Sequence, residues 1–438
     1  MVPVIPAGDK AALRARLMNR SQLNDETVTE KVKEIVKSVR EKGDEALLQY
    51  TARFDKAHLT ADGMRVTPEE IRAAYDGADP EWLCAMREAA RRITAFHEKQ
   101  KQKTWLDFQE GMHLGQMVRP LSAVGVYVPG GTAAYPSSVL MNVLPARVAG
   151  VQKIVMATPP GPDGHVSYAP TLVAADIAGV DEIYKMGGAQ AVAALAFGTG
   201  TVPRVDKIVG PGNIYVANAK REVFGHVGID MVAGPSEVLV IADGSANAAF
   251  VAADLLSQAE HDVLSAAVLV TPSQGLAYAV AHELDKQAEA LSRRNIAVAS
   301  LLTYGTIVLT EDLREAAEIA NEVAPEHLEL CVSDPYGLLP LIRNAGAIFL
   351  GHYSPEPLGD YYAGPNHVLP TSGTARFFSP LSVDDFVKKT SLIHYEKDAL
   401  RAAAEDIILL ARKEGLTAHA NAVAIRFGLP MDGEQGGE

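Results

Sequence analysis

Apolar positions in the first 120 residues recur with the period of an α-helix. A predicted helix starts near residue 25, stops at Gly43 and has five apolar positions on one face, namely Val28, Val32, Ile35, Val36 and Val39. Thr67-Pro68-Glu69-Glu70 is typical of a capping box with proline in the first turn, and a long helix is expected over residues 81–101. The first 24 residues hold only a short helical run, so we expect an arm that packs on another part of the molecule.

After residue 119 the pattern changes to short β-branched runs that alternate with alanine-rich helical stretches. Each run has about the length of one strand and ends in glycine or proline, which is typical of βαβ units and parallel sheets. The runs form two series, at 124–130, 153–160, 182–188 and 207–212, and then at 236–243, 266–273, 306–310 and 347–351. Two α/β domains are therefore predicted, followed from about residue 381 by helices.

Composition then excludes several classes of protein. The chain has 438 residues, and 40 Lys and Arg against 54 Asp and Glu give a formal charge of −14, which disfavours a phosphate-backbone partner. Two cysteines cannot form a disulfide framework or a four-thiolate zinc site. The longest uncharged stretch, residues 121–146, is interrupted by prolines and makes a poor membrane span. We expect a soluble cytoplasmic protein that binds neither nucleic acid nor membrane.

Glycine and proline cluster at the carboxyl ends of the predicted strands, where parallel sheets bind ligands. The clusters are Pro129-Gly130-Gly131, Gly210-Pro211-Gly212-Asn213, Gly234-Pro235-Ser236-Glu237 and Gly364-Pro365-Asn366-His367. Each of them could equally be a tight turn. The sequence has no G-x-G-x-x-G motif after a strand, no P-loop and no Cys-x-x-Cys, so a dinucleotide would bind without the usual glycine fingerprint.

Some residues are candidate metal ligands. Gln258 and His261 are three residues apart on one helical face, Asp360 lies in a glycine-rich loop, and His419 lies in a C-terminal helix. Imidazole, carboxylate and amide oxygen all bind zinc, but spacing cannot join positions so far apart, and the solvated end of a helix looks the same.

Glu326 and His327 follow a proline at a predicted helix start, which puts two proton-transfer groups at one point. The helix dipole would favour the charged glutamate and lower the pKa of the histidine, although capping residues look similar. Cys331 could act as a thiol nucleophile, but its neighbours indicate a buried strand, where a cysteine usually fills apolar space.

Many of these segments, in this order, closely resemble the L-histidinol dehydrogenase family. The matching strings are PGGTAAYPSSVLMNVLPARVAGV, GGAQAVAALAFGT, VDKIVGPGNIYVANAK, AGPSEVLVIAD, LLSQAEHD, APEHLEL, GDYYAGPNHVLPTSGTARF and LTAHANAV, with YTARFD nearer the N-terminus. The resemblance implies a zinc-dependent homodimer with shared active sites. It would oxidise L-histidinol through bound L-histidinal to L-histidine and reduce two NAD+, the last two steps of histidine biosynthesis.

The resemblance also implies a fold with two incomplete Rossmann-like, aldehyde-dehydrogenase-like parallel-sheet domains and helical N- and C-terminal arms. Residues 1–24 would form the first arm, and residues 25–120 with 230–380 the α/β domain that carries the zinc and catalytic residues. Residues 121–229 would form the α/β domain on the NAD side, and residues 381–438 the helical arm that reaches the partner subunit.

Residue roles follow from the same motifs. The family implies one zinc ion per subunit, bound by Gln258, His261 and Asp360, with His419 reaching the zinc of the neighbouring subunit. Glu326 and His327 would transfer protons. Ser236 and Glu414 would contact the substrate together with His327 and the zinc ligands, and the NAD site would include Tyr127, Gln190 and Asn213.

Three alternatives remain open. A paralogue with the same zinc and NAD chemistry could act on another alcohol, such as sulfopropanediol, although the acidic Glu414 suits a cationic substrate. A zinc hydrolase could use Glu326 and His327 to activate water and would not need NAD. A non-catalytic metal-binding scaffold would have no use for that pair.

Overall fold

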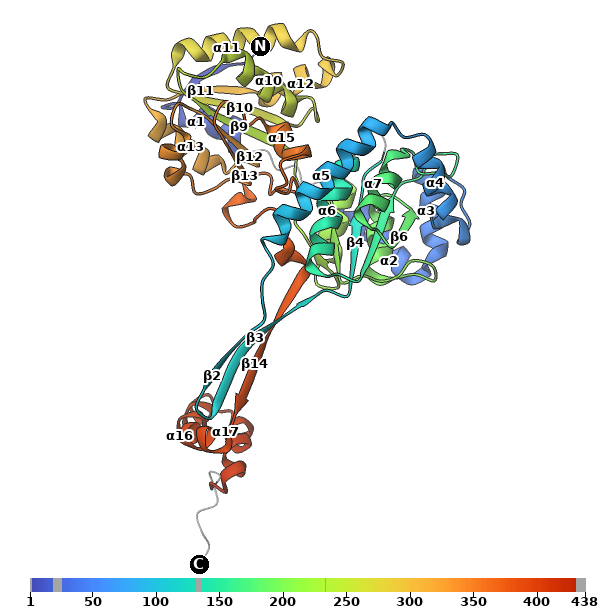
Figure 1. Ribbon diagram of the computed structural model, residues 1–438, viewed down its shortest axis with the longest axis vertical. Helices are drawn as coiled ribbons and strands as arrows, with labels where there is room; N and C mark the ends of the chain where they lie inside the picture. The colour runs from blue at the N-terminus through green and yellow to red at the C-terminus, as the bar shows by residue number, and fades with distance from the viewer. Residues whose placement is uncertain (1, 19–25, 131–134, 233, 431–438) are drawn as a thin grey trace, which may run out of the picture. The chain divides into compact units, whose positions relative to one another are not determined.

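Residues 2–18, 26–130, 135–232 and 234–430 are described by a computed structural model, shown in Figure 1. The chain divides into two compact units. Unit 1 comprises residues 1–101 and 120–386, and unit 2 comprises residues 102–119 and 387–438. Unit 1 contains two parallel sheets with helices on both faces, and unit 2 contains a three-stranded sheet and the C-terminal helices.

The first sheet of unit 1 has six parallel strands in the order β1-β11-β10-β9-β12-β13. The side chains of β9 alternate between two apolar layers, as the period of a strand requires. Val238 and Val240 pack on the side of α10, α11 and α12, whereas Leu239 and Ile241 pack on the side of α13. The strands are β1 Val4–Pro6, β9 Glu237–Ala242, β10 Ala266–Thr271, β11 Thr306–Leu309, β12 His327–Cys331 and β13 Ala347–Leu350. The helices are α1 Lys10–Leu13, α10 Ala248–Ala259, α11 Gln274–Ala288, α12 Arg294–Tyr304, α13 Leu313–Val323, α14 Pro335–Leu338 and α15 Glu356–Tyr361.

The second sheet of unit 1 has five parallel strands in the order β6-β5-β4-β7-β8. Its strands are β4 Ala123–Tyr127, β5 Lys153–Thr158, β6 Glu182–Lys185, β7 Lys207–Val209 and β8 Gly228–Ile229. One face is covered by α4 Pro68–Asp76, α5 Pro80–Glu98, α6 Pro136–Ala149 and α7 Pro170–Ala178. The other face is covered by α2 Glu26–Lys42, α3 Asp44–Phe54, α8 Gly188–Phe197 and α9 Ile214–Val223. The eight predicted β-branched runs each contain a strand of one of these two sheets.

Helices α2 to α5 cover a different sheet from the one that the sequence indicated. The expected grouping joined residues 25–120 to residues 230–380, but α2 packs on α8 and α9, while α4 and α5 pack on α7 and α6. Helical periodicity shows which face of a helix is buried and does not show which sheet buries it. The N-terminal arm, expected over residues 1–24, contributes the edge strand β1, which pairs with β11.

Unit 2 combines strands with helices, so the segment 381–438 is more than the helical arm that was expected. Its sheet has the order β14-β3-β2, and β2 and β3 are antiparallel. A small apolar cluster between the two helices contains Ile408, Ala411, Ala420 and Ala424. The elements are β2 Trp105–Gln109, β3 Met112–Pro120, β14 Val387–Tyr395, α16 Lys397–Lys413 and α17 Thr417–Ala424.

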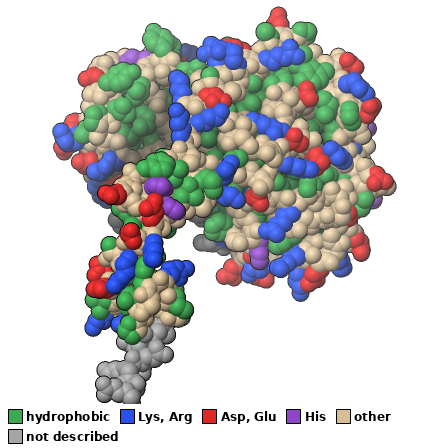
Figure 2. All heavy atoms as spheres, turned by 60° about the horizontal axis from the view of Figure 1, so that its bottom comes forward, with side chains coloured by type: hydrophobic (Ala, Val, Ile, Leu, Met, Phe, Trp, Pro, Cys, Tyr) green, Lys and Arg blue, Asp and Glu red, His purple; other side chains and the backbone are tan. Residues whose placement is uncertain are grey.

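Acidic and basic side chains are mixed over the face of the protein that Figure 2 shows. Across the described ranges, the structure contains no helix that is both long and apolar enough to span a membrane.

Candidate active site

A cavity of about 730 Å³ lies where loops from both sheets of unit 1 meet. Its walls come from the carboxyl ends of β4, β7 and β8 and from the amino ends of β9, β10 and β12. The glycine–proline clusters at Gly130 and Gly210 therefore lie at carboxyl ends as expected, apart from residue 131, which is outside the described residues. The other two clusters were misplaced, because Gly234 precedes β9 and Gly364 follows α15. Loops that enter and leave a strand have the same composition, so the sequence could not tell the two ends apart.

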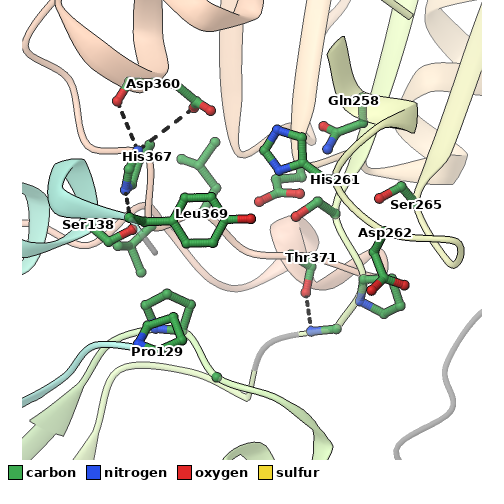
Figure 3. Close-up of a pocket in the computed structure, with 18 of the residues that line it drawn as sticks. Pro129, Ser138, Gln258, His261, Asp262, Ser265, Asp360, His367, Leu369 and Thr371 are labelled. Carbon is green, nitrogen blue, oxygen red and sulfur yellow. Dashed lines mark hydrogen bonds and ion pairs between the residues drawn. The ribbon is translucent and has the colours of Figure 1, made fainter. Parts of the chain in front are cut away.

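Three of the predicted metal ligands project into this cavity (Figure 3). Gln258 is the penultimate residue of α10, His261 follows that helix, and Asp360 lies on α15. Atoms of His261, Asp360 and Glu356 that can bind a metal all lie within 4.8 Å of one another. Neither amide atom of the buried Gln258 side chain has a hydrogen-bond partner among the described residues.

The protonation of these groups also suits a metal. Burial lowers the pKa of the His261 imidazole, which keeps it neutral and free to coordinate. Burial opposes the charge of Asp360, but the interaction with His327 and the positive charge of that imidazole hold the pKa of Asp360 below its usual value. A neutral imidazole, a carboxylate and an unpartnered amide oxygen fit a zinc ion.

His327 is the first residue of strand β12, so the expected helix start at Glu326 and His327 was wrong. The imidazole is surrounded by carboxyl groups: its Nε2 lies 3.7 Å from Asp360 Oδ1, and its Nδ1 lies 3.8 Å from Glu326 Oε2 and 3.9 Å from Glu356 Oε1. Burial would lower the pKa of His327, but Glu356, Glu326 and Asp360 together raise it to about 10. The His327 Nε2 atom has no hydrogen-bond partner within the described part of the chain.

The pKa of Glu326 is shifted in the opposite direction to the expected one. Its Oε2 accepts a hydrogen bond from the backbone N–H of Glu237 at 3.0 Å, and the charge of His327 favours ionisation. Burial outweighs both effects and raises the pKa of Glu326 to about 8. Without a helix start at this position, no helix dipole counters the cost of removing the carboxylate from water.

The pocket contains two groups that sequence reasoning did not assign. The buried Glu356 accepts a hydrogen bond from Ser257 Oγ at 3.2 Å and faces His327. His367 Nδ1 lies 2.9 Å from the backbone oxygen of Asp360, and its Nε2 lies 3.1 Å from Ser138 Oγ (Figure 3). The position of Glu356 one helical turn before Asp360 was the available signal, but it required knowing that α15 is a helix.

The three predicted NAD contacts all lie at the carboxyl edge of the five-stranded sheet. Asn213 lines the cavity and caps α9, its side chain accepting from the backbone N–H groups of Tyr215 and Val216. Tyr127 and Gln190 are buried and do not line it. The Tyr127 hydroxyl accepts a hydrogen bond from the Gly188 N–H, whereas the Gln190 amide has no partner among the described residues.

The remaining predicted residues divide between the two units. Ser236 lines the cavity of unit 1 with Glu326 and His327. Glu414 and His419 belong to unit 2, where they line a separate, mostly apolar cavity of about 640 Å³ between α16 and α17. The structure therefore groups Ser236, Gln258, His261, Glu326, His327 and Asp360 in one pocket, without Glu414 and His419.

Comparison with known proteins gives consistent matches over nearly the whole chain. Residues 18–427 match the family model for histidinol dehydrogenase. The chain is 58% identical over 412 residues to the histidinol dehydrogenase of Caldanaerobacter subterraneus subsp. tengcongensis, covering 94% of this chain and 95% of the relative. The corresponding protein of Clostridium acetobutylicum is 55% identical over 412 residues, with 94% and 95% covered. The crystal structure of histidinol dehydrogenase from Elizabethkingia anophelis is similar with a TM-score of 0.91, at 37% identity and with 97% of each chain covered.

Proposed function

The chain belongs to the histidinol dehydrogenase family, and we propose that it carries out the complete four-electron oxidation of L-histidinol in a zinc-containing, shared active site. That the protein is an NAD-dependent histidinol dehydrogenase of histidine biosynthesis follows from its family. What we propose beyond the family is that the site contains zinc, that L-histidinal stays bound between the two oxidations, that two NAD+ are reduced, and that a second subunit contributes residues. In the balanced overall reaction, protonated L-histidinol, water and two NAD+ give L-histidine, two NADH and three protons.

The observation that carries the proposal is the unpartnered amide of Gln258 in one pocket with His261, Asp360, Glu326 and His327. Gln258, His261 and Asp360 of one subunit, with His419 of the other, are the proposed zinc ligands. Zinc, when bound, supplies a Lewis acid that orients the substrate nitrogens and a positive charge that opposes the carboxylates around His327.

His327 is the proposed base that removes the alcohol proton in each oxidation. Its Nε2 has no hydrogen-bond partner in the described structure and lies 3.7 Å from Asp360 Oδ1. A base must be neutral, and the carboxylates that raise the pKa of His327 to about 10 favour its protonated form. The charge of a zinc ion bound by Asp360 would lower that pKa and leave Nε2 free to take the proton. Glu326, adjacent to it, is proposed to activate the water that hydrates the aldehyde before the second oxidation. Because these two groups transfer the protons, the mechanism needs no cysteine nucleophile. The substrate itself would be held through Ser236, Glu414, His327 and the zinc ligands, with the carboxylate of Glu414 facing a cationic group.

NAD+, when bound, is the oxidant of each step because it accepts the hydride. Tyr127, Gln190 and Asn213 are the proposed contacts, and the unpartnered amide of Gln190 supports a polar ligand at this sheet edge.

A homodimer is proposed because two of the assigned residues lie in unit 2. Helix α16 leaves large apolar side chains on the surface, among them Leu409 at 56% and Leu410 at 65% exposed. Such surfaces mark association sites, and hydrophobic side chains are visible among the charged ones on unit 2 in Figure 2. In the proposed dimer, unit 2 of each subunit brings Glu414 and His419 to the pocket of the other. The cytoplasmic location remains a prediction.

The test is the amount of NADH formed from purified protein with limiting L-histidinol, counted to completion before and after chelator treatment. We expect two NADH per histidinol, lost on chelation and restored by zinc. One NADH per substrate would show that the aldehyde is released. No NADH from a zinc-loaded protein would contradict the proposal and favour a related alcohol as substrate or a hydrolase.

A further inference from the structure

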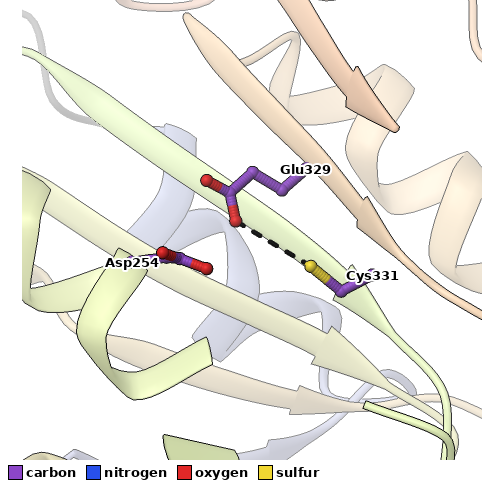
Figure 4. A group of neighbouring side chains, drawn as sticks. All are labelled: Asp254, Glu329 and Cys331. Atoms are coloured by element: carbon purple, nitrogen blue, oxygen red, sulfur yellow. Dashed lines mark hydrogen bonds between the residues drawn. The ribbon is translucent and has the colours of Figure 1, made fainter. Parts of the chain in front are cut away.

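Behind the pocket lies a buried group of ionisable side chains that the proposed reaction does not use (Figure 4). Glu329 and Cys331 are on strand β12, and Asp254 is on helix α10. Alternate residues of β12 face opposite sides of the sheet, so Glu329 and Cys331 share the side of α10 with His327, while Leu328 and Leu330 face α13. Glu329 is fully buried.

The carboxyl groups of Asp254 and Glu329 lie close together, with carboxylate oxygens within 4.8 Å of each other. Burial, together with the charge of Asp254, raises the pKa of Glu329 well above its usual value, and burial raises the pKa of Asp254 to about 6. Two carboxyl groups this close in a dry environment do not both carry a charge, so we expect one proton to be held between them at neutral pH. The Cys331 thiol points at Glu329 Oε2 over 3.9 Å, and burial raises its pKa, which makes it a neutral neighbour and not a nucleophile.

The other carboxyl oxygen of Glu329 supports the helix that carries Asp360. Glu329 Oε1 accepts a hydrogen bond from the backbone N–H of Glu356, the first residue of α15, at 2.9 Å. The residue before it is Pro355, which provides no side-chain cap. Glu329 therefore takes the place of an N-cap from a neighbouring strand, satisfying a buried N–H that would otherwise have no partner.

Glu329 thus links three of the elements that carry residues of the proposed site. It lies two residues after His327 on β12, it caps α15 one turn before Asp360, and its carboxyl group lies beside that of Asp254, on α10 one turn before Gln258. A second link joins α10 to α15, because Ser257 Oγ donates to Glu356 Oε2 at 3.2 Å.

We propose that Glu329 and Asp254 are positioning residues: the hydrogen bond from α15 to Glu329 and the close contact of Glu329 with Asp254 hold α15 against α10 and β12, so that Gln258, His261 and Asp360 converge on one metal ion. This inference rests on the proposed zinc site. Outer groups that orient metal ligands typically change metal affinity by about 10- to 100-fold when they are removed.

The test compares Glu329→Leu with Glu329→Gln in the full-length protein, with zinc affinity measured by competition against a chelator. Leucine removes the hydrogen bond to α15 and the polar group that faces Asp254, so we expect zinc to bind about 10- to 100-fold more weakly. Glutamine can accept from the Glu356 N–H and offer an N–H group to the Asp254 carboxylate, so its zinc affinity should stay within about threefold of wild type. If the two variants behave alike, these hydrogen bonds do not position the site.

Asn321→Leu is the matched control for loss of a buried polar side chain. Asn321 is buried on α13 of the same sheet and holds a loop through Arg343 and Asn344, away from the cavity. The Asn321→Leu variant should have a lower midpoint of thermal unfolding than wild type and an unchanged zinc affinity. If Asn321→Leu lowers zinc affinity as much as Glu329→Leu does, the loss of affinity is explained by general destabilisation, and the inference is overturned.

Hydrogen exchange of the α15 amides gives a readout that does not need zinc. We expect faster exchange at Glu356 in Glu329→Leu and unchanged exchange in Glu329→Gln. If Glu329→Leu does not fold, Asp254→Leu removes the carboxyl group beside Glu329 from a less buried position and should also weaken zinc binding. A wild-type protein that binds no zinc would contradict the proposed function, whereas equal zinc binding by wild type and the leucine variants would contradict only this inference.

Discussion

The Nε2 atom of His327 lies 3.7 Å from a carboxylate oxygen of Asp360, which joins the start of strand β12 to the last turn of helix α15. The two residues come from different elements and have different proposed roles, one as a base and the other as a zinc ligand. Their proximity explains why proton transfer and metal binding are expected to occur in a single pocket.

His327→Ala should reduce turnover by about 10²- to 10⁴-fold, the usual contribution of a positioned general base. The measurement is steady-state NADH formation from L-histidinol, with zinc content checked in the same preparation. His165→Ala is the control, because His165 is exposed and lies outside the cavity lining. Turnover near the wild-type value in a zinc-loaded His327→Ala protein would remove His327 from the role of base.

Glu326→Gln should slow the oxidation of L-histidinal at least as much as that of L-histidinol. The reason is that only the second oxidation needs a hydrated aldehyde, and Glu326 is proposed to activate that water. The two steps are separated by supplying each substrate in turn and following NADH. If only histidinol oxidation is slowed, the water-activating role is assigned to the wrong residue.

Mixed dimers test whether the two subunits share an active site. A His419→Ala subunit and a Glu326→Gln subunit should each be inactive alone, but a heterodimer contains one pocket in which all proposed groups are intact. We expect activity to be partly restored after the two are refolded together, with heterodimers verified by differential tags. Verified heterodimers without activity would show that each site is built within one chain.

Asp55→Asn should make the protein more stable at neutral and alkaline pH. One carboxylate oxygen of Asp55 is buried without a hydrogen-bond partner among the described residues, and burial raises the pKa of Asp55 to about 6, from 3.8. A raised folded-state pKa favours the folded protein below pH 3.8, and this contribution is lost as the pH rises through about 6. Because the group is partly exposed, we expect a gain of about 1 kcal/mol in unfolding free energy at pH 8. Denaturant titrations should show no difference near pH 4, and an equal gain at both pH values would contradict the titration of Asp55.

Asp230→Asn should destabilise the loop that leads to Asn213. Lys220 and Asp230 form a buried ion pair, and each also binds Gly210: Asp230 Oδ2 accepts from its N–H at 2.8 Å, and Lys220 Nζ donates to its oxygen at 3.0 Å. Breaking a buried pair costs about 3–5 kcal/mol, so we expect a large fall in unfolding free energy and a higher KM for NAD+.

The control for that variant is Lys153→Gln. Lys153 pairs with Glu182 on the same sheet but is 41% exposed, so its loss should cost at most about 1 kcal/mol. If the two variants have equal effects on stability and on KM, the buried pair has no special role in the loop.

Much of this protein could be predicted from its sequence. The alternation of β-branched runs and helical stretches predicted eight of the strands, and the Thr67 capping box is present at the start of α4. The motifs around Gln258, Glu326 and Asp360 indicated the family and the types of side chain in the site, because those patterns are local in the chain.

Tertiary structure alone decided how these parts combine. The apolar face of α2 was visible in the sequence, but its partners α8 and α9 were not, because periodicity identifies a buried face and not its neighbour. The pKa of Glu326 depends on burial and on His327, Glu237 and Glu356, two of which are distant in sequence. The same is true of the capping of α15 by Glu329. Chain-local patterns determine which residues are present and which faces are buried, whereas protonation and ligand convergence depend on contacts between distant segments that exist only in the folded chain.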